Sequence, residues 1–243
     1  MEKSKVRRNL NLSTIEGMFW AVMYGAGDSY ISALGVFLNF TAFQISLLNS
    51  FPQFIGSCFQ LLSATIKNKF KRIRKFVSII SLIQSLMWLL LIVLIKSYDN
   101  FFIILIWACV YFSLASVIAP AWTAWMGYFV PNRLRARYFG KRNRIIGFTT
   151  FVATFSAGYI LDLFDDNMIL GFSIIFSLAF LGRLLSAFYL NKKYDFNRKE
   201  TNNLYQYIKS IRNQKNVRQI YYYIKFISYI SFSMMFFGPL FSI

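Results

Sequence analysis

Histidine is absent from this chain of 243 residues, and cysteine occurs only twice, at Cys58 and Cys109. The absence of imidazole excludes the zinc and haem sites that use histidine ligands. Both cysteines lie inside apolar runs, where a thiol packs as a small hydrophobic group. The sequence therefore predicts no metal centre.

Acidic residues number only 9, and few of them are near enough in sequence to suggest a catalytic pair of carboxylates. The chain also lacks a Walker-type phosphate loop and a G-x-S-x-G nucleophile motif. The run Gly25-Ala26-Gly27 is no dinucleotide fingerprint, because no strand–helix–strand unit surrounds it. We therefore expect neither an enzyme nor a cofactor.

Charge of either sign is scarce. Charged residues make up 15% of the chain, whereas a soluble domain carries about 25%. Hydrophobic residues reach 57% and aromatic residues 20%. Too little polar surface is left to solvate a soluble fold, so the composition predicts a membrane protein whose first partner is the lipid bilayer.

Six segments have the roughly 20 mainly apolar residues that a helix needs to cross lipid with its backbone satisfied internally. They are Ile15–Leu38, Gln44–Ile66, Phe76–Ile95, Phe101–Gly127, Ile145–Leu161 and Met168–Leu190. A seventh apolar run covers residues 220–243. The sequence therefore predicts an all-α integral membrane fold with four parts: a cytoplasmic N-terminus (1–14), a six-helix transmembrane bundle (15–190), a cytoplasmic linker (191–219) and a partial seventh transmembrane helix (220–243).

The basic residues are unevenly distributed. Of the 27 Lys and Arg residues, nearly all precede the first span or lie in the links after the second, fourth and sixth spans. Cytoplasmic loops of membrane proteins carry such an excess. We therefore expect a multi-pass protein of the bacterial cytoplasmic (inner) membrane with its N-terminus in the cytoplasm. The formal net charge of +18 is then an orientation signal, and no nucleic acid is expected as a partner.

Asp28 interrupts the first span roughly 20 Å along the helix from Ile15, well within the hydrocarbon core. Tyr24 and Ser32 share its helical face. A carboxylate at that depth needs water, a cation or a hydrogen-bond partner. We expect Asp28, with Tyr24 and Ser32, to bind substrate or a coupling ion. The alternative is a structural hydrogen bond between helices.

Two further spans carry polar stripes at helical spacing. The stripe in the second span contains Asn49, Gln53, Gly56 and Gln60, and the stripe in the fourth contains Ser113, Ser116, Pro120 and Thr123. Such stripes either line a water-filled cavity or hydrogen-bond helices to one another. Taken together with Asp28, they favour one shared polar cavity, with Asn49, Gln53, Gln60 and Thr123 as further substrate contacts.

Interruptions at matching places suggest a repeat of three plus three spans. Gly25-Ala26-Gly27 interrupts the first span and Pro120 the fourth, and paired interruptions of this kind point to a transport site. Arg183, Trp122 and Trp125 lie towards the cytoplasmic ends of their spans. We expect Arg183 to snorkel to the interface and both tryptophans to anchor there, without a role in binding.

Three stretches of the sequence resemble the major facilitator superfamily, in particular an uncharacterised bacterial group of its members. They are GAGDSYI (25–31), FQISLL (43–48), and PAWTAWMG (120–127) running on to RYFGKRNR (137–144). The last of these is the most specific, and the resemblance covers essentially the whole chain.

This resemblance also implies a cytoplasmic gate. The family motif G-x-x-x-D-R-x-G-R-R aligns from residue 64 onward, where Asn68 replaces its Asp and Lys69 its first Arg. In the connection between the fourth and fifth spans, Tyr128 and Asn132 stand where relatives have acids. The residues expected at the gate are Asn68, Lys69, Arg72, Arg137 and Arg142.

The function implied by the resemblance is that of a secondary active transporter, which moves a small-molecule substrate of unknown identity by alternating access. A proton or a sodium ion is the expected coupling ion. Because the sequence ends within the seventh span, we expect a fragment, the N-terminal half of such a transporter. The alternative is a truncated, non-transporting membrane protein, or a half-transporter that needs a partner C-terminal half.

Overall fold

The computed structural model describes residues 3–69, 72–97 and 100–195, which belong to one compact unit. Within these residues the chain is helical and contains no strand. The long helices, in chain order, are α1 (Lys3–Ala26), α3 (Ala42–Lys69), α4 (Ile73–Ser97), α5 (Phe101–Phe129), α6 (Arg135–Leu163) and α7 (Met168–Lys192). A 3-10 turn (Asp28–Tyr30) and the short helix α2 (Ile31–Phe37) follow α1. The part of the predicted linker after residue 195 and the predicted seventh helix lie outside the described residues.

Four of the described helices are long and apolar enough to cross a membrane: α4, α5 as far as Gly127, α6, and α7 with the turn before it. Helix α1 begins at Lys3, within the predicted N-terminal segment, and ends at Ala26, so the apolar run predicted as one span is divided between α1 and α2. Helix α3 carries amides and hydroxyls along its length. The all-helical membrane class is thus confirmed, whereas the count of six transmembrane helices stays a prediction.

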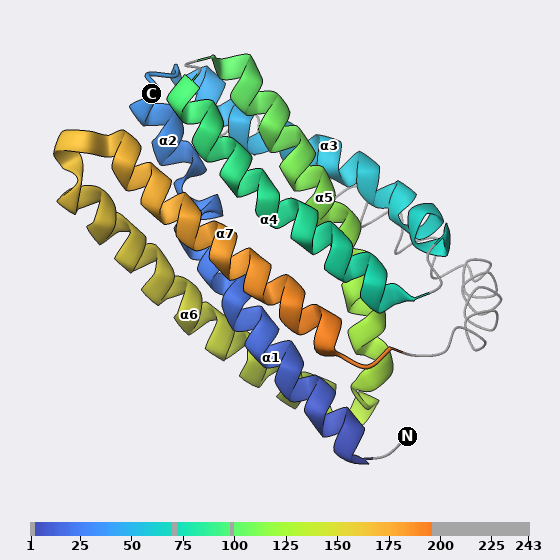
Figure 1. Cartoon of the computed structure of the whole chain (residues 1–243). Coiled ribbons are helices and arrows are strands. Elements are labelled where there is room, and N and C mark those ends of the chain that lie inside the picture. The colour runs from blue at the N-terminus through green and yellow to red at the C-terminus, as the bar shows by residue number, and fades with distance from the viewer. Residues whose placement is uncertain (1–2, 70–71, 98–99, 196–243) are drawn as a thin grey trace. The chain divides into compact units, whose positions relative to one another are not determined.

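The long helices pack side by side in the order α3, α5, α4, α7, α1, α6 (Figure 1). Each helix of the first three (α1, α3, α4) has a counterpart in the second three (α5, α6, α7). When every helix is exchanged for its counterpart, the packing order becomes the same order read in reverse. A repeat of three plus three helices would produce this symmetric pairing. It places α4 and α7 at the centre of the row and α3 and α6 at its two ends.

Helices α3, α5 and α7 each begin directly after a residue whose side chain accepts a hydrogen bond from the backbone of the first turn. Before α3, Gln44 donates its backbone N–H to the Thr41 hydroxyl at 3.3 Å, and its side-chain oxygen accepts the Thr41 N–H at 2.8 Å. This reciprocal arrangement is a capping box. Asn100 caps α5 at 2.9 Å, and Asn167 caps α7 at 3.2 Å. These capping side chains thus satisfy backbone groups at the starts of α3, α5 and α7.

The break after α1 is held by close packing of Gly27 against Trp88 of α4. A Cβ on Gly27 would lie 2.5 Å from the Trp88 indole, which is why a residue without a side chain occupies this position. Trp88 is fully buried and packs against Trp107 and Tyr111 of α5 at centroid distances of 5.6 and 5.0 Å. This aromatic cluster fixes the position of Asp28, the residue next to Gly27.

Gly56, a member of the predicted stripe in the second span, lies where α3 and α5 approach closely. A Cβ at this position would lie 2.6 Å from the Ser116 hydroxyl and 3.0 Å from the Phe112 carbonyl. Small residues allow membrane helices to pack at such short range. At this point the two predicted stripes therefore meet through helix packing.

Replacing Gly27 by alanine should lower the free energy of unfolding by about 1–3 kcal/mol, because the buried Trp88 would have to move away from the new methyl group. Gly147→Ala in α6 is the matched control, since a Cβ there meets nothing within 4 Å. Thermal unfolding of the purified protein in detergent measures both variants. Equal melting temperatures for Gly27→Ala and Gly147→Ala would contradict the packing described here.

Candidate functional site

A cavity of about 420 Å³ lies between α1, α4, α5, α6 and α7. Each of the five helices contributes at least one polar or charged side chain, and the apolar part of the wall comes mainly from α5. The polar lining residues are Glu16, Gln84, Ser116, Thr123, Arg142 and Arg183, and the apolar ones are Trp20, Ala115, Ile118, Ala119, Trp122 and Leu190. A cavity of this volume accommodates a small molecule.

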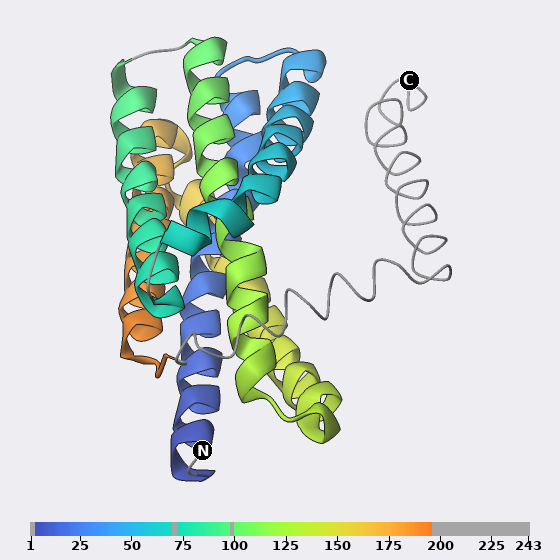
Figure 2. The ribbon, with the colours of Figure 1, turned by 90° about the vertical axis from the view of Figure 1, so that its right-hand side faces the viewer.

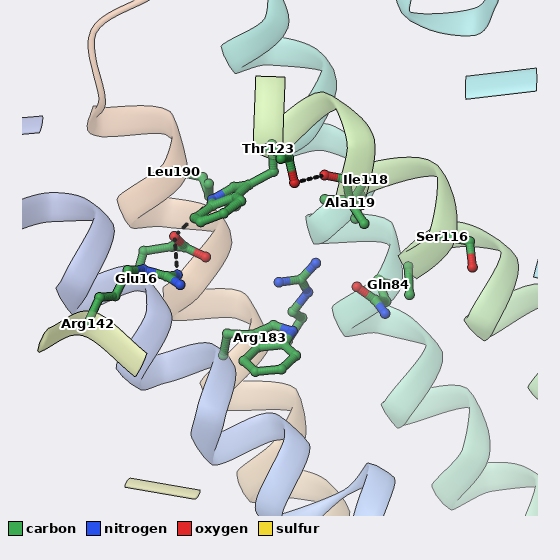
Figure 3. A pocket seen from close by; sticks show the side chains of 12 residues that line it. Glu16, Gln84, Ser116, Ile118, Ala119, Thr123, Arg142, Arg183 and Leu190 are labelled. Atoms are coloured by element: carbon green, nitrogen blue, oxygen red, sulfur yellow. Dashed lines mark hydrogen bonds and ion pairs between the residues drawn. The ribbon is translucent and has the colours of Figure 1, made fainter. Parts of the chain in front are cut away.

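Glu16 is buried on α1 and brings together side chains from three other parts of the unit. The Lys193 ammonium, directly after α7, donates to Glu16 Oε2 at 2.9 Å. Arg142 of α6 lies 3.7 Å from the same oxygen, and the Trp122 indole of α5 donates to it at 3.3 Å (Figure 3). Burial lowers the pKa of Lys193, and the negative charge of Glu16 opposes that shift. One carboxylate thus connects α1, α5, α6 and the end of α7.

Trp122 contributes its ring face to the same network. The Arg142 guanidinium lies 4.5 Å from the Trp122 ring centroid, within the range of a cation–π contact. Trp125 is fully buried, and its indole N–H donates to the Tyr194 carbonyl at 3.2 Å. The expectation that Trp125 anchors at a membrane interface is therefore wrong, because its side chain joins α5 to the end of α7 instead.

Arg183 lies on α7 with only 4% of its surface exposed. Figure 3 shows its guanidinium pointing into the middle of the cavity, with Gln84 on one side and Glu16 on the other. One N–H donates to the Ser186 hydroxyl at 3.3 Å, whereas Nε has no partner. The expectation that Arg183 snorkels to the interface is wrong. Helix α7 packs against both α1 and α4, and the side chain faces the bundle interior, which leaves no route along lipid.

Asp28 lies in the break between α1 and α2, half-buried beside the aromatic cluster. The fully buried Tyr111 hydroxyl of α5 donates to Asp28 Oδ1 at 2.6 Å. Arg183 is near enough for its charge to act on this carboxylate. The geometry thus supplies the hydrogen bond between helices that the sequence left as an alternative, and binding of a substrate or ion by Asp28 stays a prediction.

The other predicted residues of the first span have partners of their own. Tyr24 is exposed and stacks on Trp20 at a centroid distance of 5.3 Å. The Asn49 amide of α3 donates to Ser32 Oγ at 2.9 Å and to the Ile45 carbonyl at 3.0 Å. Because the helix breaks at Gly27, residues before and after the break do not continue one helical face.

Of the remaining predicted substrate contacts, Thr123 lines the cavity, and its hydroxyl donates to the Ala119 carbonyl at 2.9 Å. Gln53 and Gln60 of α3 are exposed on the surface of the unit and are not among the lining residues. The expected single cavity therefore contains part of the stripe from the fourth span and none of the exposed amides of the second span. The reason is that α3 lies at one end of the row of helices, beyond α5.

Of the predicted gate residues, Arg142 lines the cavity. Arg72 and Arg137 are exposed at the starts of α4 and α6. Asn68 and Lys69 lie at the end of α3, and their side chains fall outside the described residues.

Glu16, Gln84 and Lys193 belong to the site without having been predicted from the sequence. A signal for the first of them was present, because Glu16, Asp28 and Arg183 are the charged residues within the six predicted spans. Charges at membrane depth pair with one another or mark functional sites. The uncharged Gln84 carries no such signal, and Lys193 lies in a basic link where nothing distinguishes it from its neighbours.

The family model described as Major Facilitator Superfamily matches residues 13–243. The matched range includes every residue that lines the cavity. No curated protein and no solved structure matches the chain.

Replacing Glu16 by glutamine should lower the free energy of unfolding by about 3–5 kcal/mol, because the Lys193 ammonium would stay buried without its counter-charge. The double variant Glu16→Gln, Lys193→Met removes both charges and should recover most of that loss. Lys75→Met, at an exposed position near the start of α4, is the control and should change stability by less than about 0.5 kcal/mol. Thermal unfolding in detergent gives all three values. A double variant less stable than Glu16→Gln would contradict the pairing.

Proposed function

Because the chain belongs to the major facilitator superfamily, we propose that it is a secondary transporter that moves a small molecule across the membrane by alternating access. The observation that carries the proposal is the buried guanidinium of Arg183, which points into a cavity between apolar helices. Charged residues at membrane depth face a bundle interior or a water-filled path and mark solute or ion routes. The family consists of transporters, so no enzymatic reaction is proposed.

In this proposal the cavity holds the transported solute. Arg183 and Gln84 supply polar contacts from α7 and α4, and Thr123 adds a hydroxyl from α5. Trp20 supplies an aromatic wall from α1. Thr123 is exposed while Arg183 and Gln84 are buried, so a solute would enter along α5 and bind at the buried end.

Asp28 and Tyr111 supply the second part of the proposal, a site for a coupling proton or sodium ion. Tyr111 donates to one oxygen of the Asp28 carboxylate, and the other oxygen has lone pairs available for an ion. The charge of Arg183 acts on Asp28, so a change in the charge of Asp28 would alter the field that a solute meets beside Arg183. This electrostatic link is how ion and solute binding would be coupled.

We propose that the N-terminus is cytoplasmic and that the protein lies in a bacterial inner membrane. Figure 2 shows the start of α1 and the turn from α5 to α6 at the same end of the unit. The described basic residues of both segments, among them Arg7, Arg8, Arg133 and Arg137, would then face the cytoplasm.

The surface of α3 favours a partner bundle. Gln53, Ser57 and Gln60 are exposed there, whereas the exposed residues of α4 between Phe76 and Ile95 are all apolar. Amides facing lipid would lack hydrogen-bond partners, and polar groups in membrane helices face protein or water. We infer that α4 faces lipid, and that a second helical bundle with a water-filled path between the two covers this face of α3.

Proteoliposomes that contain the protein and are offered a mixture of small cellular metabolites should accumulate at least one of them above the level of empty liposomes. Asp28→Asn should reduce that accumulation by about tenfold or more, because it removes a charge that the proposed coupling requires. Asp165→Asn, in the exposed turn before α7, is the matched control and should accumulate normally. Mass spectrometry of the liposome contents measures the uptake. Accumulation by Asp28→Asn at the normal level would refute the assigned role.

Cysteine accessibility tests the water-filled path along α3. In a variant that lacks both native cysteines, Gln53→Cys should react with a charged, water-soluble thiol reagent about tenfold faster than Leu86→Cys, because thiolates form in water and not in lipid. Leu86 is exposed near the middle of α4 and serves as the lipid-facing control. The measurement is the rate of labelling in membranes. Equally slow labelling of the two variants would place Gln53 in lipid.

A further inference from the structure

Charge at the cavity is not balanced. Glu16, its acidic lining residue, lies 2.9 Å from Lys193 and 3.7 Å from Arg142. Among the described residues, no carboxylate forms an ion pair with Arg183. Two basic groups therefore share Glu16, and the third basic group is left without a contacting counter-charge.

The acids whose charges reach Arg183 are Glu16 and Asp28. Glu16 is already shared by Lys193 and Arg142, and Asp28 accepts the Tyr111 hydroxyl at 2.6 Å. Three basic side chains thus face two acidic ones in this buried region. A buried charge without a close partner is unfavourable, and an anion entering the cavity would supply the missing partner.

Some hydrogen-bonding atoms of the residues that line the cavity have no partner within the described structure. Arg183 donates one hydrogen bond, to Ser186 at 3.3 Å, and its Nε–H is buried without an acceptor. A guanidinium presents its N–H groups as a planar fork that matches a carboxylate. Gln84, 2% exposed beside it, has a side-chain oxygen without a partner, so its amide can bond a second polar group on a ligand.

Most of the remaining wall is apolar. Trp20, Trp122, Ile118 and Leu190 line the cavity. The Arg183 guanidinium points into this cavity (Figure 3). With a volume of about 420 Å³ the cavity is large enough for a small molecule and too small for a peptide of several residues. An inorganic ion would leave these apolar walls uncovered, whereas an organic body would bury them.

We propose that the cavity binds a small organic anion, whose carboxylate pairs with the Arg183 guanidinium and whose apolar body lies between Trp20 and Trp122. This inference rests on the proposed transport function and specifies the class of solute. Binding places the anionic group beside the guanidinium and supplies the counter-charge that Arg183 lacks. A neutral or cationic molecule of the same shape would leave Arg183 unpaired.

Quenching of tryptophan fluorescence by matched nitroaromatic probes tests this proposal on the purified full chain in neutral detergent. The probes are 4-nitrobenzoate, 4-nitrobenzamide and 4-nitrobenzylammonium, which share one ring and differ in charge. Trp20 and Trp122 line the cavity and act as reporters. We expect 4-nitrobenzoate to quench at concentrations about tenfold lower than the amide, with the ammonium probe weakest.

Four variants test whether Arg183 and the cavity cause the preference for 4-nitrobenzoate. Arg183→Gln should reduce the preference for 4-nitrobenzoate over the amide to about twofold or less, and Arg183→Lys should keep part of it, because the charge remains and the fork is lost. Arg144→Gln removes an equal charge from an exposed position on α6 and should leave the preference unchanged. Ala119→Phe fills the cavity while keeping Arg183, and should weaken quenching by all three probes. Gel filtration and melting temperature establish that each variant is folded.

The outcomes separate this inference from the proposed function. If the amide or the ammonium probe quenches as well as 4-nitrobenzoate, and Ala119→Phe weakens both, the cavity binds solutes but the inference of an anion is wrong. If Arg144→Gln lowers the preference as much as Arg183→Gln, overall protein charge explains it and the inference fails. If Ala119→Phe alters quenching by none of the probes, the cavity binds no solute, and the proposed function loses its site as well.

Discussion

The ion pair between Glu16 and Lys193 joins the first helix of the unit to the residue that follows the last one. A pair in apolar surroundings persists only while both partners are present, because either charge alone would be costly. Arg142 and Trp122 approach the same carboxylate, so α1, α5, α6 and the end of α7 meet at Glu16. The cavity lies directly beside this junction, and its shape depends on these three contacts.

Asp28, in the turn that follows α1, is held in a different way. Gly27 lets Trp88 pack against the break in the helix, which brings Asp28 to the Tyr111 hydroxyl. Arg183 lies within electrostatic reach of both acids and contacts neither. In the proposed transporter this arrangement lets one guanidinium respond both to a solute in the cavity and to a coupling ion at Asp28.

Sequence reasoning predicted the helical class, because long apolar runs decide it. It placed the starts of α1 and α6 too late, that of α6 by ten residues, because the N-terminal part of α1 and the basic first turns of α6 are not apolar. It also drew one span across the break after α1. Of the predicted substrate contacts, Thr123 lines the cavity, and the role of Asp28 stays a prediction. Sequence reasoning assigned Arg183 to the interface, because helical spacing alone does not say which face of α7 packs inward. The amides of α3 were expected in the cavity, and only the packing order, with α3 at one end of the row, shows that Gln53 lies outside it.

Crystals of the protein grown with 4-iodobenzoate would test the central claim most directly, because iodine can be located by its anomalous scattering. The account predicts one strong iodine peak inside the cavity between Trp20 and Trp122, with the carboxylate on Arg183, and the loss of that peak in Arg183→Gln. Iodine peaks on the protein surface alone, with the cavity empty, would contradict it.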